Sequence, residues 1–269
     1  MIDQKVYESV QCLVKEVGQF QLQHFRAVPQ GAIDRKALRE TVSYVDVESE
    51  RRLIEGLKGL VSQAGFFGEE SGRQGHQDLV WVIDPLDGTT NYLQGLEQFS
   101  ISVALVEHGR VLLGVVYKPA SGELFAALRG QGLCYNGEII ENKSQQASCG
   151  DVLYGTGFPY RSEDLAACFF KTAPKVLSLG LGIRRFGSAA LDLCYLSAGW
   201  LGGFWETDLE PYDVAAGLLF LEESGVKVTN GKGEEYSMGK DRLLIAAQPK
   251  VYPDLFPLIE EGYRELGIT

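Results

Sequence analysis

The sequence has few histidines and cysteines, and neither type forms a recognisable cluster. The three histidines lie far apart, which disfavours a histidine metal site and phosphohistidine chemistry. The five cysteines are odd in number and include no CxxC pair, so neither a zinc site nor a disulfide framework is indicated. We therefore expect free thiols in a reducing cytosol, and a cytoplasmic protein.

Long apolar runs and basic runs are also missing. No apolar stretch approaches the ~18 residues that span a bilayer, and charged residues interrupt the first twenty positions, so we expect neither a membrane segment nor a signal peptide. Lys and Arg total 25 against 36 Asp and Glu, a net charge of −11. Without a Lys/Arg-rich run, this acidic balance argues against nucleic-acid binding.

What is present is the composition of an ordinary globular protein with a substantial core. The 269 residues are 45% apolar and 23% charged, enough for one large domain or two modest ones. The polar stretch 142–150 predicts a boundary between an N-terminal α+β part, 1–148, and a C-terminal α/β part, 149–269.

Apolar spacing in the first quarter of the chain predicts helices joined by a hairpin. Residues 3–27 have the spacing of an amphipathic helix, and 28–40 are typical of a loop or loose hairpin. Residues 41–46 are strand-like, and Asp46 is predicted to N-cap a helix that ends near residue 62. The polar residues 71–78 predict a short loop.

The rest of the chain predicts strands and then alternating strands and helices. Asn136-Gly137 is a strong signal for a two-residue turn. After residue 150, strand and helix patterns alternate as far as a final helix from about 250, which argues for layered α/β packing. Further strands are expected at 98–106, 110–118 and 123–128.

The most informative stretch, residues 79–92, reads LVWVIDPLDGTTNY. Its apolar start predicts a short strand, buried on both faces, that ends at Asp84 because Pro85 cannot donate a ladder hydrogen bond. Gly88 permits an unusual backbone angle, and the threonines that follow suit the start of a helix. Asp84 and Asp87 are thus predicted at a strand end beside a helix N-terminus, where donors for phosphate are free.

Two other segments repeat this arrangement of acids after an apolar run. Glu69 and Glu70 follow Gly65-Phe66-Phe67, and Asp213 follows Gly203-Phe204-Trp205 and opens a helix-like run. A single D-x-x-D-G would usually be a turn and nothing more. Three strand ends that all deliver carboxylates instead predict a metal site built from oxygen ligands.

These segments, GEES, WVIDPLDGTTNY and YDVAAG, resemble those of the inositol monophosphatase family, within the lithium-sensitive, Mg-dependent sugar phosphatase superfamily. Residues 126–137 resemble the family's Gly-rich hairpin, and 185–193 its substrate-side turn. The likeness keeps the family order over nearly the whole chain. It implies alternating helix and sheet layers with the site between the two halves, and a homodimer.

The resemblance implies Mg²⁺-dependent hydrolysis of a phosphate monoester, with inositol monophosphate as the first candidate. Divalent ions neutralise phosphate oxygens, lower the pKa of a bound water and stabilise the leaving alkoxide. Two to three Mg²⁺ ions are expected, and Li⁺ is expected to inhibit. The implied metal ligands are Glu69, Asp84, Asp87, Asp213 and the main-chain carbonyl of Leu86.

The nucleophile is predicted to be water, because no cysteine, serine or histidine stands in a recognisable nucleophile motif. Glu69 and Thr89 would hold that water, and Asp46 would polarise the Thr89 hydroxyl so that it can relay a proton. The main-chain N–H groups of Gly88 and Thr89 are predicted to bind phosphate oxygens.

The expected substrate is a small phosphorylated polyol or sugar. Ser188 is also expected to cap a helix, and Glu70 is placed behind the metal ligands or at a third, weaker metal. Tyr212 stands where the family usually has Trp, so an aromatic wall persists. For the substrate hydroxyl groups the resemblance implies Asp87, Glu206 and the main chain of Gly187, Ser188 and Ala189.

Other phosphatases and a non-enzyme remain as alternatives. A haloacid-dehalogenase-type nucleophile is excluded because Pro85 occupies the position that its aspartate needs, and no P-loop motif is present. Within the superfamily, a phosphatase of fructose 1,6-bisphosphate, 3′-phosphoadenosine-5′-phosphate, histidinol phosphate or NADP fits the same motifs. Outside it, a non-catalytic cation-binding protein is the alternative.

Overall fold

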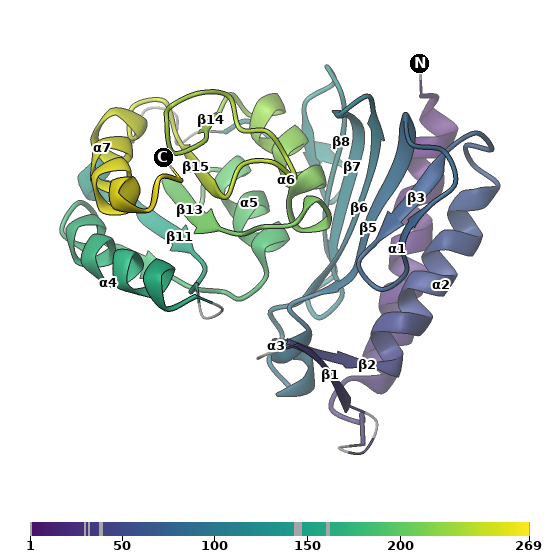
Figure 1. Ribbon diagram of the computed structural model, residues 1–269. Coiled ribbons are helices and arrows are strands. Elements are labelled where there is room, and N and C mark those ends of the chain that lie inside the picture. The colour runs from purple at the N-terminus through teal and green to yellow at the C-terminus, as the bar shows by residue number, and fades with distance from the viewer. Residues whose placement is uncertain are drawn as a thin grey trace.

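A computed structural model describes residues 2–29, 31, 33–37, 40–142, 147–159 and 162–268 of the chain. It has five alternating layers: a helix pair, an eight-stranded sheet, a second helix pair, a five-stranded sheet and a third helix pair (Figure 1). The α/β fold of alternating layers that the sequence predicts is confirmed.

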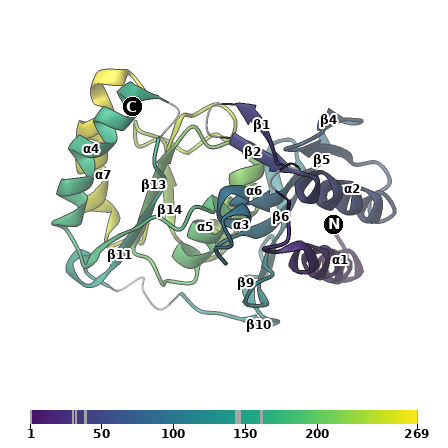
Figure 2. The same cartoon turned by 90° about the horizontal axis from the view of Figure 1, so that it is seen from below.

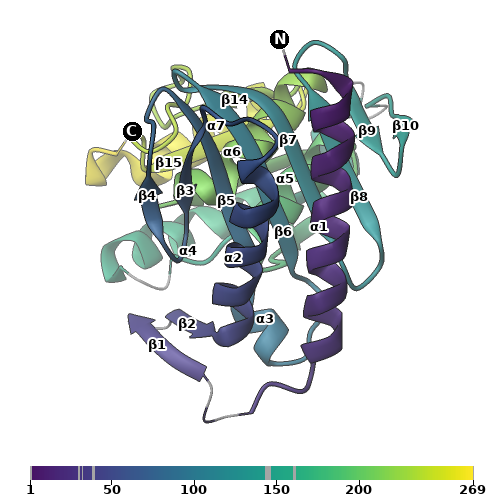
Figure 3. The same ribbon diagram turned by 90° about the vertical axis from the view of Figure 1, so that its right-hand side faces the viewer.

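The first layer is the pair α1, Gln4–His24, and α2, Tyr44–Lys58, which lie side by side on the outer face of the large sheet (Figure 3). Val10, Val14 and Val17 recur at helical spacing on α1 and are buried. Between the helices, β1 (Ile33–Ala37) and β2 (Glu40–Ser43) form an antiparallel hairpin, in the segment where a loose hairpin is expected.

The start of α2 corrects the predicted cap. Ser43, not Asp46, is the N-cap, and its hydroxyl accepts from Val45 N. Asp46 is the third residue of the helix, and its carboxylate accepts from Ser43 N at 2.9 Å, which completes a capping box. The helix also ends at Lys58, earlier than predicted.

The large sheet has the strand order β10-β9-β8-β7-β6-β5-β3-β4. Its pairs are antiparallel except β3 with β5, which is parallel. The strand β4 corrects the loop predicted for 71–78, because it pairs with β3 in a tight hairpin. The strands are β3 Gly65–Gly68, β4 Gly72–Gln74, β5 Leu79–Asp87, β6 Ser100–Glu107, β7 Arg110–Lys118, β8 Glu123–Leu128, β9 Leu133–Tyr135 and β10 Glu138–Ile139.

Both faces of this sheet are covered, as the unbroken apolar run of β5 predicts. Trp81 and Ile83 face α1 and α2, whereas Val80 and Val82 face the central helices. Those central helices, α5 (Ala189–Ser197) and α6 (Pro211–Glu223), lie between the two sheets (Figure 2). The largest core cluster packs around this middle layer, with residues from both sheets.

The strand β5 runs past Asp84, where it was predicted to end. Asp84 pairs with Ser102 and Asp87 with Ser100, so Pro85 and Leu86 together oppose one residue of β6. At this bulge the proline does not have to donate a hydrogen bond to β6. The side-chain amide of Gln21, on α1, donates to Pro85 O at 2.7 Å. The chain then enters the short helix α3, Thr89–Leu93.

The second half builds the five-stranded sheet in the order β12-β11-β13-β15-β14, with parallel pairing in β12-β11-β13. The helices α4 (Glu163–Leu177) and α7 (Tyr252–Tyr263) cover its outer face (Figure 1). Short 3₁₀ turns lie at Cys149–Asp151 and Arg264–Leu266. The strands are β11 Leu153–Thr156, β12 Gly182–Arg184, β13 Gly203–Thr207, β14 Lys227–Thr229 and β15 Leu243–Ala247.

In the part of the chain that the structure describes, the helices are too short or too polar for any of them to cross a bilayer.

Gly88, between β5 and α3, generates a prediction about the fold. Its φ is 91°, and a Cβ there would lie 2.8 Å from Gln98 O and 3.0 Å from Gly187 O. Gly88→Ala should therefore lower the free energy of unfolding by the backbone cost of about 1–2 kcal/mol plus about 1–3 kcal/mol of overpacking. Gly109→Ala is the matched control, because its φ is 81° and nothing lies within 4 Å of the added carbon. Equal losses in thermal or urea unfolding would contradict the close packing at Gly88.

Candidate metal and substrate site

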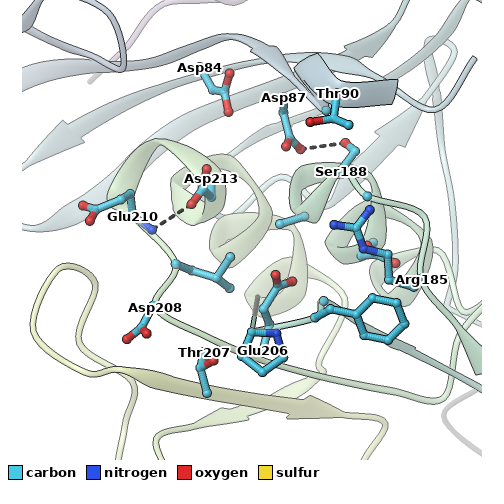
Figure 4. Close-up of a pocket in the computed structure, with 18 of the residues that line it drawn as sticks. Asp84, Asp87, Thr90, Arg185, Ser188, Glu206, Thr207, Asp208, Glu210 and Asp213 are labelled. Carbon is cyan, nitrogen blue, oxygen red and sulfur yellow. Dashed lines mark hydrogen bonds between the residues drawn. The ribbon is translucent and has the colours of Figure 1, made fainter. Parts of the chain in front are cut away.

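A cleft of about 450 Å³ lies where the ends of β3, β5 and β13 meet the first turns of α3, α5 and α6 (Figure 4). Its volume is in the range of pockets that bind small molecules. The predicted site residues that line it are Glu69, Asp84, Leu86, Asp87, Gly88, Thr89, Gly187, Ser188, Ala189, Glu206 and Asp213.

Three of the predicted metal ligands converge in this cleft. Asp84, Asp87 and Asp213 each offer a carboxylate oxygen, and these oxygens lie within 4.8 Å of one another. Figure 4 shows Asp84 and Asp87 on one wall, with Asp213 facing them from the start of α6. The segments that bring them together are more than 120 residues apart in the sequence (213 − 87 = 126).

Parallel pairing of β3 and β5 places Glu69 beside Asp84. The two strands end at the same edge, and Glu69 N donates to Ile83 O at 3.1 Å. The buried carboxylate of Glu50, on α2, accepts from the next two backbone N–H groups, of Glu70 at 2.8 Å and Ser71 at 2.9 Å. These two hydrogen bonds to Glu50 therefore hold the turn that carries Glu69 in place.

Asp87 connects the two halves of the molecule. Its Oδ2 accepts from Ser188 Oγ at 2.6 Å and from Ala190 N at 2.8 Å. These donors belong to the first turn of α5, where Ser188 is the N-cap, as predicted. A helix N-terminus stabilises a negative charge, so one oxygen of Asp87 is held by α5 while the other faces the cluster.

Asp213 is oriented by the cap of its own helix. Glu210 N donates to Asp213 Oδ2 at 2.7 Å in a capping box at the start of α6. Asp208, five residues earlier and before α6 begins, lies at the rim of the cleft and forms a two-point ion pair with Arg242. Tyr212 lines the cleft and packs edge-on against Phe67, with ring centroids 5.8 Å apart.

The charges of these acids oppose one another. Burial, and then the neighbouring carboxylates, raise the pKa of Asp84 well above its usual range. Burial and the charge of Asp87 do the same to the pKa of Asp213. Burial also raises the pKa of Asp87 to about 6, against the hydrogen bonds from α5 that lower it. The donors are all oxygens of like charge in a confined space, which is the environment that fits a hard divalent cation.

Thr89 and Asp46 form the hydrogen-bonded pair that the proton-relay prediction requires. Thr89 Oγ1 lies 2.8 Å from Asp46 Oδ1 and 2.9 Å from Leu86 O. The other oxygen of Asp46 accepts from Ser43 Oγ at 2.7 Å, and the side chain is almost fully buried. Asp46 does not line the cleft itself, but it contacts Thr89, which does.

The opposite wall of the cleft carries Glu206 and Arg185 (Figure 4). Glu206 extends from the end of β13 and lies against Gly157, where a Cβ would come within 1.7 Å of Glu206 Oε1. Gly187 has a φ of 83°, and its carbonyl lies close to Gly88. Both segments that were predicted to contact substrate hydroxyl groups therefore line the same cleft as the acids.

One predicted residue lies apart, and three others were missed. Glu70 does not line the cleft, and its backbone N–H is bound by Glu50. Sequence reasoning missed Glu50, Arg185 and Asp192. Glu50 lies one helical turn after Asp46, and Asp192 is one turn after Ser188, so helical spacing was the signal that places both beside the site.

The repulsion within the cluster generates a prediction about stability. The folded-state pKa of Asp84 is raised, so its contribution to stability is present below the unfolded pKa of about 3.9 and is lost as pH rises through the folded value. At pH 7.5 and without divalent ions, Asp84→Asn should therefore raise the Tm by about 2–4 °C, the shift that roughly 1 kcal/mol produces in a chain of about this size.

The same comparison at pH 4 should show a smaller gain, because the wild-type carboxyl is then protonated. The exposed Asp78→Asn is the control and should change Tm little at either pH. A lower Tm for Asp84→Asn in thermal unfolding at pH 7.5 would contradict the repulsion.

Comparisons with known proteins agree with this geometry. A sequence profile described as the inositol monophosphatase family matches residues 3–262. The Nus factor SuhB of Xylella fastidiosa is 36% identical over 255 residues, which cover 93% of this chain and 92% of that protein.

Two solved structures extend the likeness to three dimensions. The extragenic suppressor protein suhB of Bartonella henselae superposes with a TM-score of 0.89 at 31% identity, covering 96% of this chain and 99% of that one. The IMPase of Thermotoga maritima gives a TM-score of 0.88 at 30% identity, covering 98% and 100%. With a matching profile over nearly all its length and a shared fold, this chain belongs to the inositol monophosphatase family.

Proposed function

We propose that this protein is a Mg²⁺-dependent phosphate monoester hydrolase whose substrate is a phosphorylated polyol or sugar, with inositol monophosphate as the first candidate. The observation that carries the proposal is the convergence of Asp84, Asp87 and Asp213 within 4.8 Å in a cleft beside the start of α3, which has no side-chain cap. A phosphate dianion is repelled by such a cleft unless cations reverse the local charge, so the acids and the phosphate imply a divalent ion between them.

Glu69, Asp84, Asp87, Asp213 and the Leu86 carbonyl are the groups that would hold two to three ions. When bound, Mg²⁺ supplies neutralisation of phosphate charge, activation of water and stabilisation of the leaving oxygen. The family membership of the chain and the all-oxygen donor set both support this choice of ion.

The chain itself provides the proton path. As water oxygen attacks phosphorus, the water proton passes toward Thr89 Oγ1, whose own proton is directed at Asp46 Oδ1, 2.8 Å away. Burial raises the pKa of Asp46, which favours its acceptance of a proton. The bond between phosphorus and the alcohol oxygen breaks, and the alcohol leaves with a proton from solvent.

The substrate is oriented by groups at both ends of the cleft. The main-chain N–H groups of Gly88 and Thr89, at the entrance to α3, would bind phosphate oxygens. Glu206 and the main chain of Gly187–Ala189 lie on the alcohol side and suit hydroxyl groups. The proposal includes a homodimer, on family grounds, and a cytoplasmic location, which the five free thiols support.

A second candidate function follows from the names of the relatives. The relative named Nus factor SuhB from Xylella fastidiosa, at 36% identity, is not named as a phosphatase, which favours a non-catalytic cation-binding protein as the alternative. The net charge of −11 supports a protein partner rather than nucleic acid. Phosphate release from inositol 1-phosphate with and without Mg²⁺ separates the two. The hydrolase should release phosphate when Mg²⁺ is present, whereas the binding protein should release none.

The proposed metal ligands generate the first activity prediction. Asp213→Asn should lower kcat/KM for inositol 1-phosphate by at least about 10³-fold, as expected when transition-state charge stabilisation is lost, while circular dichroism stays unchanged. Wild-type activity should require Mg²⁺ and fall when Li⁺ is added. Asp208→Asn is the control, because Asp208 is already paired with Arg242 at the rim. A near-normal rate for Asp213→Asn would remove this residue from the metal site.

Thr89 generates the second activity prediction. Thr89→Val keeps the shape of the side chain but removes the hydroxyl, so kcat should fall by about 10²–10⁴-fold, the range of a lost proton-transfer group. Thr89→Ser keeps the hydroxyl beside Asp46 and should retain activity within about tenfold. Steady-state kinetics of both variants test the relay, and equal activities of the valine and serine variants would exclude it.

A further inference from the structure

Asp192, in the first turn of α5, has a carboxylate oxygen that the described residues leave without a partner. The side chain is 1% exposed, yet Oδ1 accepts no hydrogen bond from any described residue, and none of them forms an ion pair with it. Asp192 also lines the cleft that holds the acid cluster. A buried oxygen of this kind is unusual, since nearly all buried polar atoms in folded proteins have a partner.

The surroundings of Asp192 show that the fold leaves room for its carboxylate. Gly155, inside β11, lies against Leu201 and Asp192, and Gly157, just after the strand, lies against Glu206. A Cβ at Gly155 would lie 3.1 Å from Asp192 Oδ1, and one at Gly157 would lie 1.7 Å from Glu206 Oε1. Two glycines, two positions apart, thus accommodate two carboxylates on the alcohol side of the cleft.

The charges around Asp192 do not satisfy its free oxygen. Burial, and then the charges of Glu206 and Asp87, raise the pKa of Asp192, and Arg185 only partly offsets them. Arg185 instead lies over the ring of Phe158, 5.7 Å from its centroid. An acceptor that is desolvated and unpaired destabilises the empty cleft, and a ligand that donates a hydrogen bond removes that cost.

A hydroxyl group of the substrate is the donor that fits. The phosphate end is placed by the acid cluster and α3, so the alcohol part extends toward Glu206 and Asp192. We propose that Asp192 is a specificity-determining residue that accepts a hydrogen bond from a second hydroxyl of the substrate alcohol. The cleft would then select phosphate esters of polyols over esters whose alcohol has no other hydroxyl. This inference rests on the proposed function and narrows its substrate class.

A matched pair of esters tests this selection. Inositol 1-phosphate and cyclohexyl phosphate share a six-membered carbon ring and differ in the ring hydroxyls. The wild-type protein should prefer the inositol ester in kcat/KM measured with Mg²⁺. Asp192→Ala should lower that value by about 10- to 100-fold, the range for leaving a buried hydrogen-bonding group without its partner. It should leave cyclohexyl phosphate within about threefold.

Two further variants separate recognition from folding. Asp192→Asn keeps the shape and one acceptor oxygen, so its loss on the inositol ester should be intermediate. Asp254→Asn makes the same change in the first turn of α7, away from the cleft, and should behave as wild type on both esters. Equal losses on the two esters in the Asp192 variants would show a structural role and overturn the proposal. An unchanged preference, or no preference in the wild type, would overturn it as well.

A binding measurement distinguishes failure of the proposed hydrolysis from failure of the proposed recognition by Asp192. If the wild-type protein releases no phosphate from either ester, the same esters are titrated calorimetrically in the presence of Mg²⁺. Tighter binding of inositol 1-phosphate that disappears in Asp192→Ala would then support the recognition and reject the hydrolase. Equal binding of both esters, in both proteins, would reject the recognition.

Discussion

The structure depends on holding several carboxylates close together against their mutual repulsion. Asp84, Asp87 and Asp213 share a space less than 5 Å across; burial raises the pKa of each, and the neighbouring carboxylates raise those of Asp84 and Asp213 further. The fold compensates with donors at the starts of helices, and the charge of Arg185 also lowers the pKa of Asp87. The N-terminus of α5 holds Asp87, and the capping box of α6 holds Asp213. Because each acid keeps a fixed position, the cleft is prepared for a cation before one binds.

This support comes from elements that lie far apart in the sequence. Glu50 on α2 fixes the turn that carries Glu69, and Gln21 on α1 fixes the bulge between Asp84 and Asp87. The two outer helices therefore do more than cover the large sheet. Through single buried polar side chains they also determine the positions of loops on its edge, which is how a rigid scaffold gives precision to a site built at strand ends.

Much of this arrangement could be predicted from sequence, because the apolar runs and the acids that follow them are local signals. The run before Asp84 and the capping pattern at Ser188 both gave the correct elements. The end of β5 could not be predicted in the same way, since a bulge depends on the partner strand β6 and on Gln21, 64 residues away. Asp46 was misplaced as a cap because Ser43 also offers a side-chain oxygen and only three-dimensional geometry decides between them. Asp192 drew no attention because an unpaired oxygen is visible only once its surroundings are known.

The bond between Asp87 and the first turn of α5 has a consequence for substrate size. Asp87 belongs to the edge of the large sheet, whereas Ser188 and Ala190 belong to the helix that supports the alcohol side of the cleft. An ester bound as proposed would therefore contact two elements that these hydrogen bonds hold at a fixed separation. The cleft would then discriminate between esters by the distance between their phosphate group and their hydroxyl groups.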